Sequence, residues 1–251
     1  MRKVLEFQTI AVDTLTLRKG QTIHAGESTS LYGDYDESDG ENVTGERESE
    51  ILKWLMESSF RDLLLNKLDV SSDAFIARDV ARPVIENPQG KPGDIDLLIC
   101  DGNRADQAIA FQCKRVKVKA FNQDDDDVNK LSNITGGVKQ ANFQRNNLGF
   151  HRNYLVILIE AYGKKRAGNN VLFRGPNQET FKAIYEFPMR ESLHSDVGVI
   201  FIEISQPTGK SFRKMAVVGV CIDQEAARLD QPPVLTNRIR ELIREKSSTT
   251  F

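Results

Sequence analysis

Residues 94–119, DIDLLICDGNRADQAIAFQCKRVKVK, hold the pattern that decides the fold. Apolar and polar residues alternate on both sides of residues 101–106, a segment rich in Asp, Gly and Asn. Alternation with a period of two is typical of a half-buried strand, and Asp, Gly and Asn favour a tight turn. The stretch therefore predicts two antiparallel strands, residues 94–100 and about 108–119, joined as a hairpin.

The same alternation predicts which side chains of the hairpin share a face. Asp94 and Asp96 point to one face of the first strand, and Gln112 and Lys114 to one face of the second. If the turn is centred near Arg104, Asp96 lies opposite Gln112, and Asp94 lies opposite Lys114. A slip of two residues would keep the faces and change the pairs. Either register gathers four polar groups on an otherwise apolar hairpin.

The segments around the hairpin predict an α/β fold. A mostly apolar stripe predicts a helix over residues 46–68, interrupted near Ser58-Ser59. A second helix is expected over residues 128–146, broken or kinked at Gly136-Gly137 and preceded by a solvated aspartate run. With strands at 74–84 and 154–160, the order over residues 46–160 is α-β-β-β-α-β. Outside this core we expect strand fragments within 4–17, strands at 197–205 and 215–222, and helices at 179–185 and 233–246.

Charge is distributed unevenly along the chain. The net charge is −2, but residues 26–50 hold nine acidic residues against Arg47 alone, which leaves the rest of the chain with a net charge of +6. A body of that sign favours contact with a phosphate backbone. We predict an N-terminal extension with an acidic loop (1–45), a core (46–160) and a C-terminal extension of the same domain (161–251).

Composition places the chain among globular proteins. Its 251 residues are 39% hydrophobic, and three cysteines in apolar stretches, Cys100, Cys113 and Cys221, are too few for a disulfide framework. The longest apolar run, about residues 154–159, is far shorter than a membrane span. We therefore expect a soluble cytoplasmic protein with reduced thiols and no membrane partner.

The polar groups of the hairpin suit metal-dependent hydrolysis. Carboxylate and amide oxygens are the hard ligands that Mg²⁺ prefers, and a neighbouring lysine can orient or help to deprotonate an attacking water. Such a patch supplies what phosphodiester hydrolysis requires: charge stabilisation, a nucleophile held in line, and a protonated group for developing negative charge. A chance surface hairpin with acids and lysines is the structural alternative.

At these residues the chain resembles a known family. Gly93-Asp94-Ile95-Asp96, followed after a turn by Phe111-Gln112-Cys113-Lys114, is similar to the motif of the PD-(D/E)XK nucleases. It resembles most the Mrr-like restriction-endonuclease branch, in which glutamine often replaces the acidic residue before X-Lys. The predicted element order is also similar to that family's core. The resemblance implies a restriction-endonuclease-like fold with a mixed central sheet flanked by helices.

The resemblance also implies roles for residues of this chain. Asp96, Gln112 and the backbone carbonyl of Cys113 would bind Mg²⁺, with Mn²⁺ as a substitute, and Asp94 competes with Asp96 for its role. Lys114 would position the water.

A glutamate on the first helix would complete the catalytic set of Asp96, Gln112 and Lys114. Glu50 is the first choice for it, and Glu46 and Glu48 are alternatives. Gln140 and Gln144 lie one helical turn apart, similar to the glutamine-bearing helix of exonuclease-like members, although the usual accompanying tyrosine is absent. A core-flanking role is the alternative for that pair.

The expected activity is metal-dependent endonucleolytic hydrolysis of DNA. Residues expected to contact nucleic acid are Arg115, Lys117, Lys139, Gln140, Lys164 and Lys165. One alternative is a non-catalytic nucleic-acid-binding or assembly module on the same fold. Another is the effector subunit of a restriction or anti-phage defence system that cleaves only with a protein partner. The sequence leaves a homodimer open and does not distinguish DNA from RNA.

Overall fold

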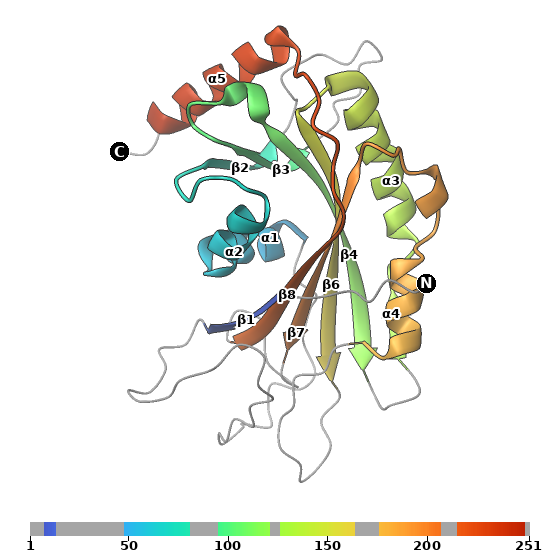
Figure 1. The fold of residues 1–251 in the computed structure, drawn as a ribbon. Coiled ribbons are helices and arrows are strands. Elements are labelled where there is room, and N and C mark those ends of the chain that lie inside the picture. Colours follow the sequence, from blue (N-terminus) through green and yellow to red (C-terminus); the bar gives the residue numbers. More distant parts are fainter. Residues whose placement is uncertain are drawn as a thin grey trace, which may run out of the picture.

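A computed structural model describes residues 8–13, 48–80, 95–120, 126–163, 176–206 and 215–248. They form an α/β fold in which helices flank a mixed sheet (Figure 1). The strands are β1 (Gln8–Asp13), β2 (Phe75–Val80), β3 (Ile95–Cys100), β4 (Ile109–Ala120), β5 (Asp126–Asn129), β6 (Arg152–Gly163), β7 (Gly198–Gln206) and β8 (Met215–Gln224). The helices are α1 (Glu48–Glu57), α2 (Phe60–Lys67), α3 (Asn133–Phe143), α4 (Gln178–Tyr185) and α5 (Pro233–Ser248).

The strand order is β1-β8-β7-β6-β4-β3-β2, and β5 pairs with β4 beside this path. The β4–β6 and β6–β7 pairs are parallel, while the other strand pairs are antiparallel. Strands from the predicted N-terminal and C-terminal extensions thus lie in the same sheet as the predicted core, with β1 next to β8 at one edge. None of the helices in the described part of the chain is long and apolar enough to cross a membrane.

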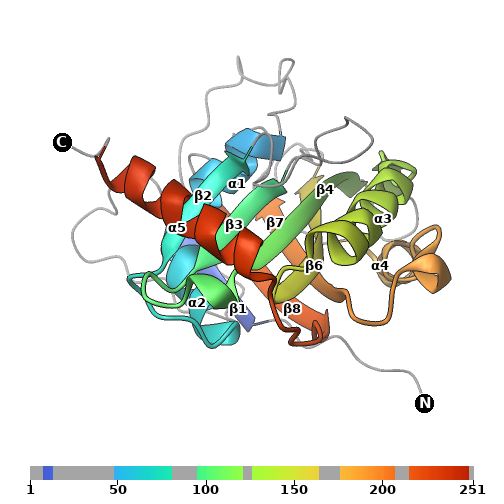
Figure 2. The same ribbon diagram turned by 90° about the horizontal axis from the view of Figure 1, so that it is seen from above.

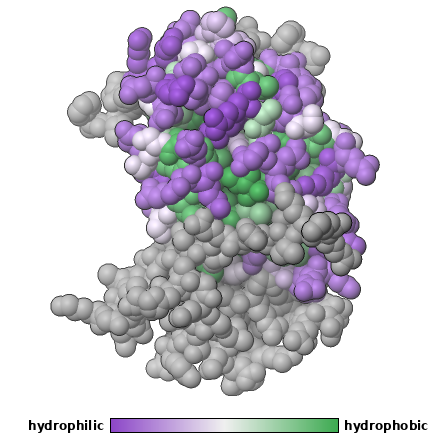
Figure 3. All heavy atoms as spheres, in the orientation of Figure 1, coloured by the Kyte–Doolittle hydropathy of each residue, from purple (hydrophilic) through white to green (hydrophobic). Residues whose placement is uncertain are grey.

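Three apolar clusters hold the helices against the sheet. Helices α1 and α2 pack on one face, against β3, β4 and β6 to β8. Helices α3 and α4 pack on the other face, against β4, β6 and β7. Helix α5 crosses over β2 and β3 at one end, as Figure 2 shows from above. Polar side chains cover most of the described surface in Figure 3, and apolar residues are visible in a band at its centre.

The predicted hairpin and its register are confirmed. Strands β3 and β4 are antiparallel, with Leu97 opposite Phe111 and Leu98 opposite Ala110. Continued by one residue, this register sets Asp96 opposite Gln112, as the alternation predicted. Asp94 lies outside the described residues, so its pairing with Lys114 stays a prediction.

The predicted start of the second helix is wrong. Residues 126–129 form the short strand β5 instead of a solvated run and the start of a helix. Val128 of β5 pairs with Val118 of β4 and packs against an apolar cluster, which explains the strand. The predicted interruption of the first helix is confirmed, because a turn at Ser58 and Ser59 separates α1 from α2.

The second helix is not broken at its two glycines. Helix α3 runs continuously through Gly136 and Gly137, and only Gly137 has a packing reason to lack a side chain. A Cβ atom at Gly137 would lie 2.5 Å from Lys114 Cγ and 3.0 Å from Leu155 Cδ1, whereas one at Gly136 would meet nothing within 4 Å. Gly137 therefore lets α3 approach β4 closely at Lys114.

This difference predicts opposite effects for two alanine substitutions. We expect Gly137→Ala to lower the free energy of unfolding by about 1–3 kcal/mol through overpacking against Lys114. Gly136→Ala, the matched control, should raise it by up to about 1 kcal/mol, because alanine is the better helix former. Urea denaturation of both variants measures the difference, and equal effects would contradict the close approach.

Candidate active site

The site lies in a break along one edge of β4. Strand β3 pairs with that edge up to Phe111, and β5 pairs with it only from Lys117 onward. Between them, residues 112–116 have no strand partner on this edge within the described chain. We call this break the β4 notch. Two backbone N–H groups, those of Cys113 and Arg115, point into it and need acceptors.

Two carboxylates supply these acceptors. Asp96, at the start of β3, accepts a 2.7 Å hydrogen bond at Oδ2 from the N–H of Cys113. Glu48, the first residue of α1, accepts a 2.8 Å hydrogen bond at Oε2 from the N–H of Arg115. The carboxylates thus continue the hydrogen bonding of the sheet edge where the neighbouring strands end, and both are held in the notch.

The helix glutamate that accepts from the N–H of Arg115 is Glu48, whereas our first choice for the site was Glu50. The two residues are two positions apart on α1, which turns their side chains about 200° away from each other around the helix axis. Glu50 is half-buried in the first turn of α1. The sequence alone could not distinguish Glu46, Glu48 and Glu50, because the distinction depends on which side chain reaches the N–H of Arg115.

Lys114 brings a cation to the same place. Its Nζ lies 3.9 Å from Oε1 of Glu48, and its side chain is 16% exposed. The methylene stem packs on Gly137 of α3, so the ammonium group is positioned by apolar contacts as well as by charge. The predicted lysine thus stands beside a carboxylate with its end within reach of solvent.

Gln112 links the notch to α3. Its Nε2 donates to Oδ2 of Asp96, so this oxygen accepts from both Gln112 and Cys113. On the other side, Oε1 of Gln112 accepts a 3.1 Å hydrogen bond from Nε2 of Gln144. Both glutamines are 1% exposed. Sequence reasoning noted Gln144 only as a possible partner of Gln140 and missed its contact with Gln112.

Arg115, which we predicted to contact nucleic acid, is buried in the structure. It is 4% exposed, and its Nε lies 2.9 Å from Oε2 of Glu160 on β6, close enough for an ion pair although the N–H is not aimed at that oxygen. Alternation along β4 turns Arg115 to the face opposite Lys114. A buried, paired guanidinium cannot reach a phosphate backbone.

The other predicted nucleic-acid contacts are placed unevenly. Lys139 and Gln140 are exposed on the outer side of α3, and Lys117 is half-buried on β4. Lys164, Lys165 and Asp94 lie outside the described residues, as does the acidic stretch up to residue 47. Their roles stay predictions.

Burial dominates the electrostatics of the two carboxyls. It raises the pKa of Asp96, although the hydrogen bond from Cys113 and the charge of Lys114 partly oppose it. It also raises the pKa of Glu48, with Lys114 again opposing and Asp96 adding to the rise. With both carboxyls ionised, Asp96, Glu48 and Lys114 sum to a charge of −1, so a cation beside them would relieve the cost of their burial.

A further acid faces Asp96 from β2. Arg78 pairs with Leu97 and Val80 with Ile95, which sets Asp79 opposite Asp96 across the ladder. Asp79 has a positive φ of 48°, a left-handed conformation that is uncommon within a strand. Its charge contributes to the raised pKa of Asp96. This residue could not be singled out from local patterns, because its position beside Asp96 depends on the β2–β3 register.

The oxygen atoms of the notch fit Mg²⁺. The described residues contain no group of three or more His, Cys, Asp or Glu side chains placed to hold a metal ion. The notch offers a smaller set: the carboxylates of Asp96 and Glu48 and the carbonyl of Cys113, which points to the same edge of β4 as its N–H. Mg²⁺ usually keeps several waters and takes only one or two protein carboxylates, so this set is sufficient for it.

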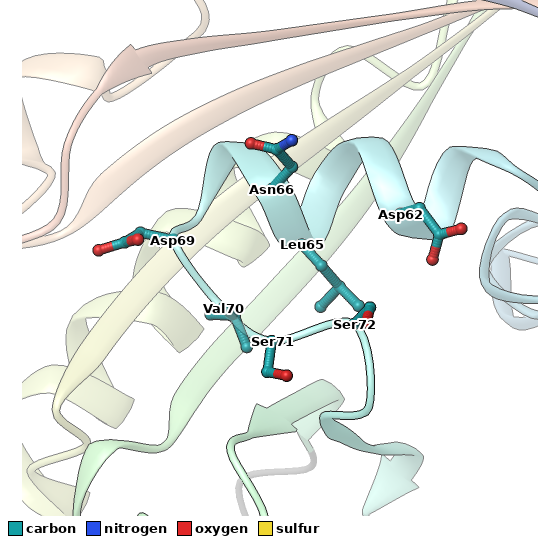
Figure 4. A pocket seen from close by; sticks show the side chains of 7 residues that line it. All are labelled: Asp62, Leu65, Asn66, Asp69, Val70, Ser71 and Ser72. Atoms are coloured by element: carbon teal, nitrogen blue, oxygen red, sulfur yellow. The ribbon is translucent and has the colours of Figure 1, made fainter.

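A hollow elsewhere on the surface shares no residue with the notch. It lies at the C-terminal end of α2 and is lined by Asp62, Leu65, Asn66, Asp69, Val70, Ser71 and Ser72 (Figure 4). Its two acids have no lysine or glutamine among the lining residues. The notch is therefore the better candidate for catalysis.

Comparison with known proteins adds no assignment. The chain matches no protein-family model, no curated protein and no solved structure.

The raised carboxyl pKa values predict how stability depends on pH. Between the ordinary values, 3.8 for Asp96 and 4.5 for Glu48, and the raised folded values, the folded chain holds more protons than the unfolded chain. In metal-free buffer, these two groups should therefore lower the free energy of unfolding as pH rises through that window. Asp96→Asn and Glu48→Gln should each make the fall shallower, because each removes one such titration.

Urea denaturation in EDTA at a series of pH values from 4 to about 7 measures this slope. Glu179→Gln, at an exposed position on α4, is the control and should keep the wild-type slope. A wild-type slope in both site variants would show that the notch carboxyls titrate as exposed groups do.

Proposed function

We propose that the chain is a Mg²⁺-dependent nuclease, a phosphodiesterase that hydrolyses DNA. The observation that carries the proposal is the convergence of Asp96, Glu48 and Lys114 on the β4 notch. Two carboxylates beside a lysine suit a reaction in which a phosphate is bound, a water attacks, and negative charge builds up. The mixed sheet and the element order support the finer assignment to a restriction-endonuclease-like core of the PD-(D/E)XK type.

Asp96, Glu48 and the carbonyl of Cys113 would hold Mg²⁺, and Mn²⁺ can substitute in such an oxygen set. When bound, the ion supplies Lewis-acid stabilisation of the phosphate and lowers the pKa of a coordinated water. The chain's own contribution is orientation. Hydrogen bonds from backbone N–H groups fix both carboxylates, so neither has to be ordered when substrate arrives.

Lys114 would position the attacking water and stabilise the charge that develops on the phosphate. Its ammonium group is placed by the contact of its stem with Gly137 and by the charge of Glu48. Glu48 in turn orients Lys114, because its Oε1 lies beside the ammonium group while its Oε2 is held by the N–H of Arg115. Lys139 and Gln140, exposed on α3, are candidates to contact the DNA backbone.

One observation favours the non-catalytic alternative, a nucleic-acid-binding or assembly module. Gln112 adds no negative charge to the notch, and its amide already donates to Asp96. A site with fewer anionic ligands binds a divalent ion less strongly. Binding of DNA without cleavage in Mg²⁺ or Mn²⁺ would support this alternative, and cleavage only on addition of a protein partner would support an effector subunit.

Replacement of the lysine tests the nuclease proposal. We expect Lys114→Met to lower the rate of plasmid cleavage in Mg²⁺ by about 100-fold or more, which is the usual cost of removing one donor that stabilises developing charge. Methionine keeps an unbranched stem against Gly137, so the fold should persist. The measurement is supercoiled-plasmid cleavage, with urea denaturation to confirm folding.

Lys182→Met provides the matched control, because Lys182 is exposed on α4, away from the notch. It should cleave at the wild-type rate. Wild-type turnover by a folded Lys114→Met variant would refute the nuclease assignment at this site.

A further inference from the structure

Two buried glutamine side chains, Gln144 and Gln112, form a chain of hydrogen bonds that ends on Asp96 in the notch. Nε2 of Gln144 donates to Oε1 of Gln112, and Nε2 of Gln112 donates to Oδ2 of Asp96. In this orientation Gln112 is a donor toward the site and presents no oxygen to it. A cation beside Asp96 would instead favour the oxygen of Gln112 on that side, because a metal ion binds oxygen and repels an N–H group.

An amide can meet this preference by turning over. The two ends of a glutamine side chain have nearly the same shape, so a 180° rotation exchanges donor and acceptor without changing the volume it fills. If Gln112 turns over, its Nε2 faces Gln144 and needs an acceptor there. Gln144 is also an amide, so it can supply its own oxygen by turning over as well. The hydrogen bond between the two glutamines then persists with its direction reversed.

Burial makes the two rotations depend on each other. Both side chains are 1% exposed, so water cannot take the place of a lost partner. If Gln112 alone turned over, two N–H groups would face each other, and a buried donor without an acceptor costs about 1–3 kcal/mol. The pair therefore has two arrangements that keep the hydrogen bond between the two glutamines, and mixed ones lose it.

The backbone around Gln144 holds it against Gln112. Gln144 begins the π-helical turn Gln144–Leu148 that follows α3, and such widened turns frequently occur at functional sites. It lies two helical turns after Gly137, the residue that lets α3 approach Lys114 closely. Helix α3 and the π-helical turn after it thus contact Lys114 and Gln112 respectively, the two residues of β4 whose side chains face the site.

We propose that Gln144 and Gln112 form a two-position amide switch that couples α3 to cation binding in the notch. Without a cation, Gln112 donates to Asp96 and holds its carboxylate in place. When a divalent cation binds beside Asp96, both amides turn over together, and Gln112 presents its oxygen to the ion. Gln144 is a positioning residue in this scheme and does not contact the ion. The inference rests on the proposed function only in requiring that the notch bind a divalent cation.

NMR spectroscopy of the full-length, isotope-labelled protein tests the switch without any activity measurement. In the cation-free protein, the side-chain amide protons of Gln112 and the N–H of Cys113 point at the same oxygen of Asp96, so they should show an NOE. Saturation with Mg²⁺, which is diamagnetic, should abolish this NOE. A new NOE should appear between the Gln112 amide protons and the side-chain methylenes of Gln144.

Gln112→Glu is the matched variant, because a carboxylate presents oxygen in both directions and needs no rotation. It should bind Mg²⁺ at least as tightly as the wild type. Its Gln144 side-chain amide should keep donating to residue 112 with and without Mg²⁺, so the Gln144 amide signals should stay in place during the titration. In the wild type the same signals should shift.

The outcomes separate the switch from the function. If Mg²⁺ perturbs the signals of Asp96 and Cys113 in the wild type but the NOE between Gln112 and Cys113 persists, the switch is wrong while cation binding stands. If the Gln144 signals shift equally in Gln112→Glu, the coupling to amide rotation is also wrong. If Mg²⁺ perturbs neither Asp96 nor Cys113 at saturating concentration, the proposed metal-dependent function fails, and the switch fails with it.

Discussion

The structure of the site depends on two backbone N–H groups that no strand satisfies. Strands β3 and β5 leave the edge of β4 before they meet, so Cys113 and Arg115 would each lose a ladder hydrogen bond in a part-buried place. A buried N–H group without a partner is costly, and a carboxylate is a strong acceptor for it. Asp96 and Glu48 fill these positions. The need to satisfy these two N–H groups therefore also brings two negative charges together in the notch.

Residues on β4, β6 and α3 offset the energetic cost of placing two carboxylates in the notch. Lys114 lies between the acids and the apolar surface of α3, and its stem can lie flat only because residue 137 is glycine. On the opposite face, the ion pair of Arg115 with Glu160 brings no unbalanced charge into the core. Removal of one partner from such a pair would leave an uncompensated buried charge, which is strongly destabilising. Among these five charged groups, the net negative charge therefore lies in the notch.

Much of this could be predicted from alternation along two strands. The faces of β3 and β4, their register, and the meeting of Asp96 with Gln112 follow from a period of two and the position of one turn. The glutamate on α1 could not be chosen, because Glu48 and Glu50 differ only in which reaches the N–H of Arg115. The burial of Arg115 was hidden for a similar reason, since its partner Glu160 is far away in sequence and reaches it only through the β4–β6 register. Local sequence patterns predict which face of a strand a side chain lies on. Whether a charged side chain on that face is buried in an ion pair or exposed depends on residues from strands distant in the sequence.

Glutamine at position 112, in place of a carboxylate, avoids repulsion with Asp96. A carboxylate there would stand directly against Asp96, and two like charges at such close range in a part-buried site disfavour ionisation of both. An amide instead donates to Asp96, so the cation-free fold has no repulsion to overcome at this pair. The same exchange weakens the ligand set for a divalent ion, because one anionic ligand is lost. A chain with glutamine here therefore favours a well-ordered site without metal over tight metal binding. Gln144 matters for the same reason, since it supplies the hydrogen bond that keeps the buried amide oxygen of Gln112 satisfied while its nitrogen serves Asp96.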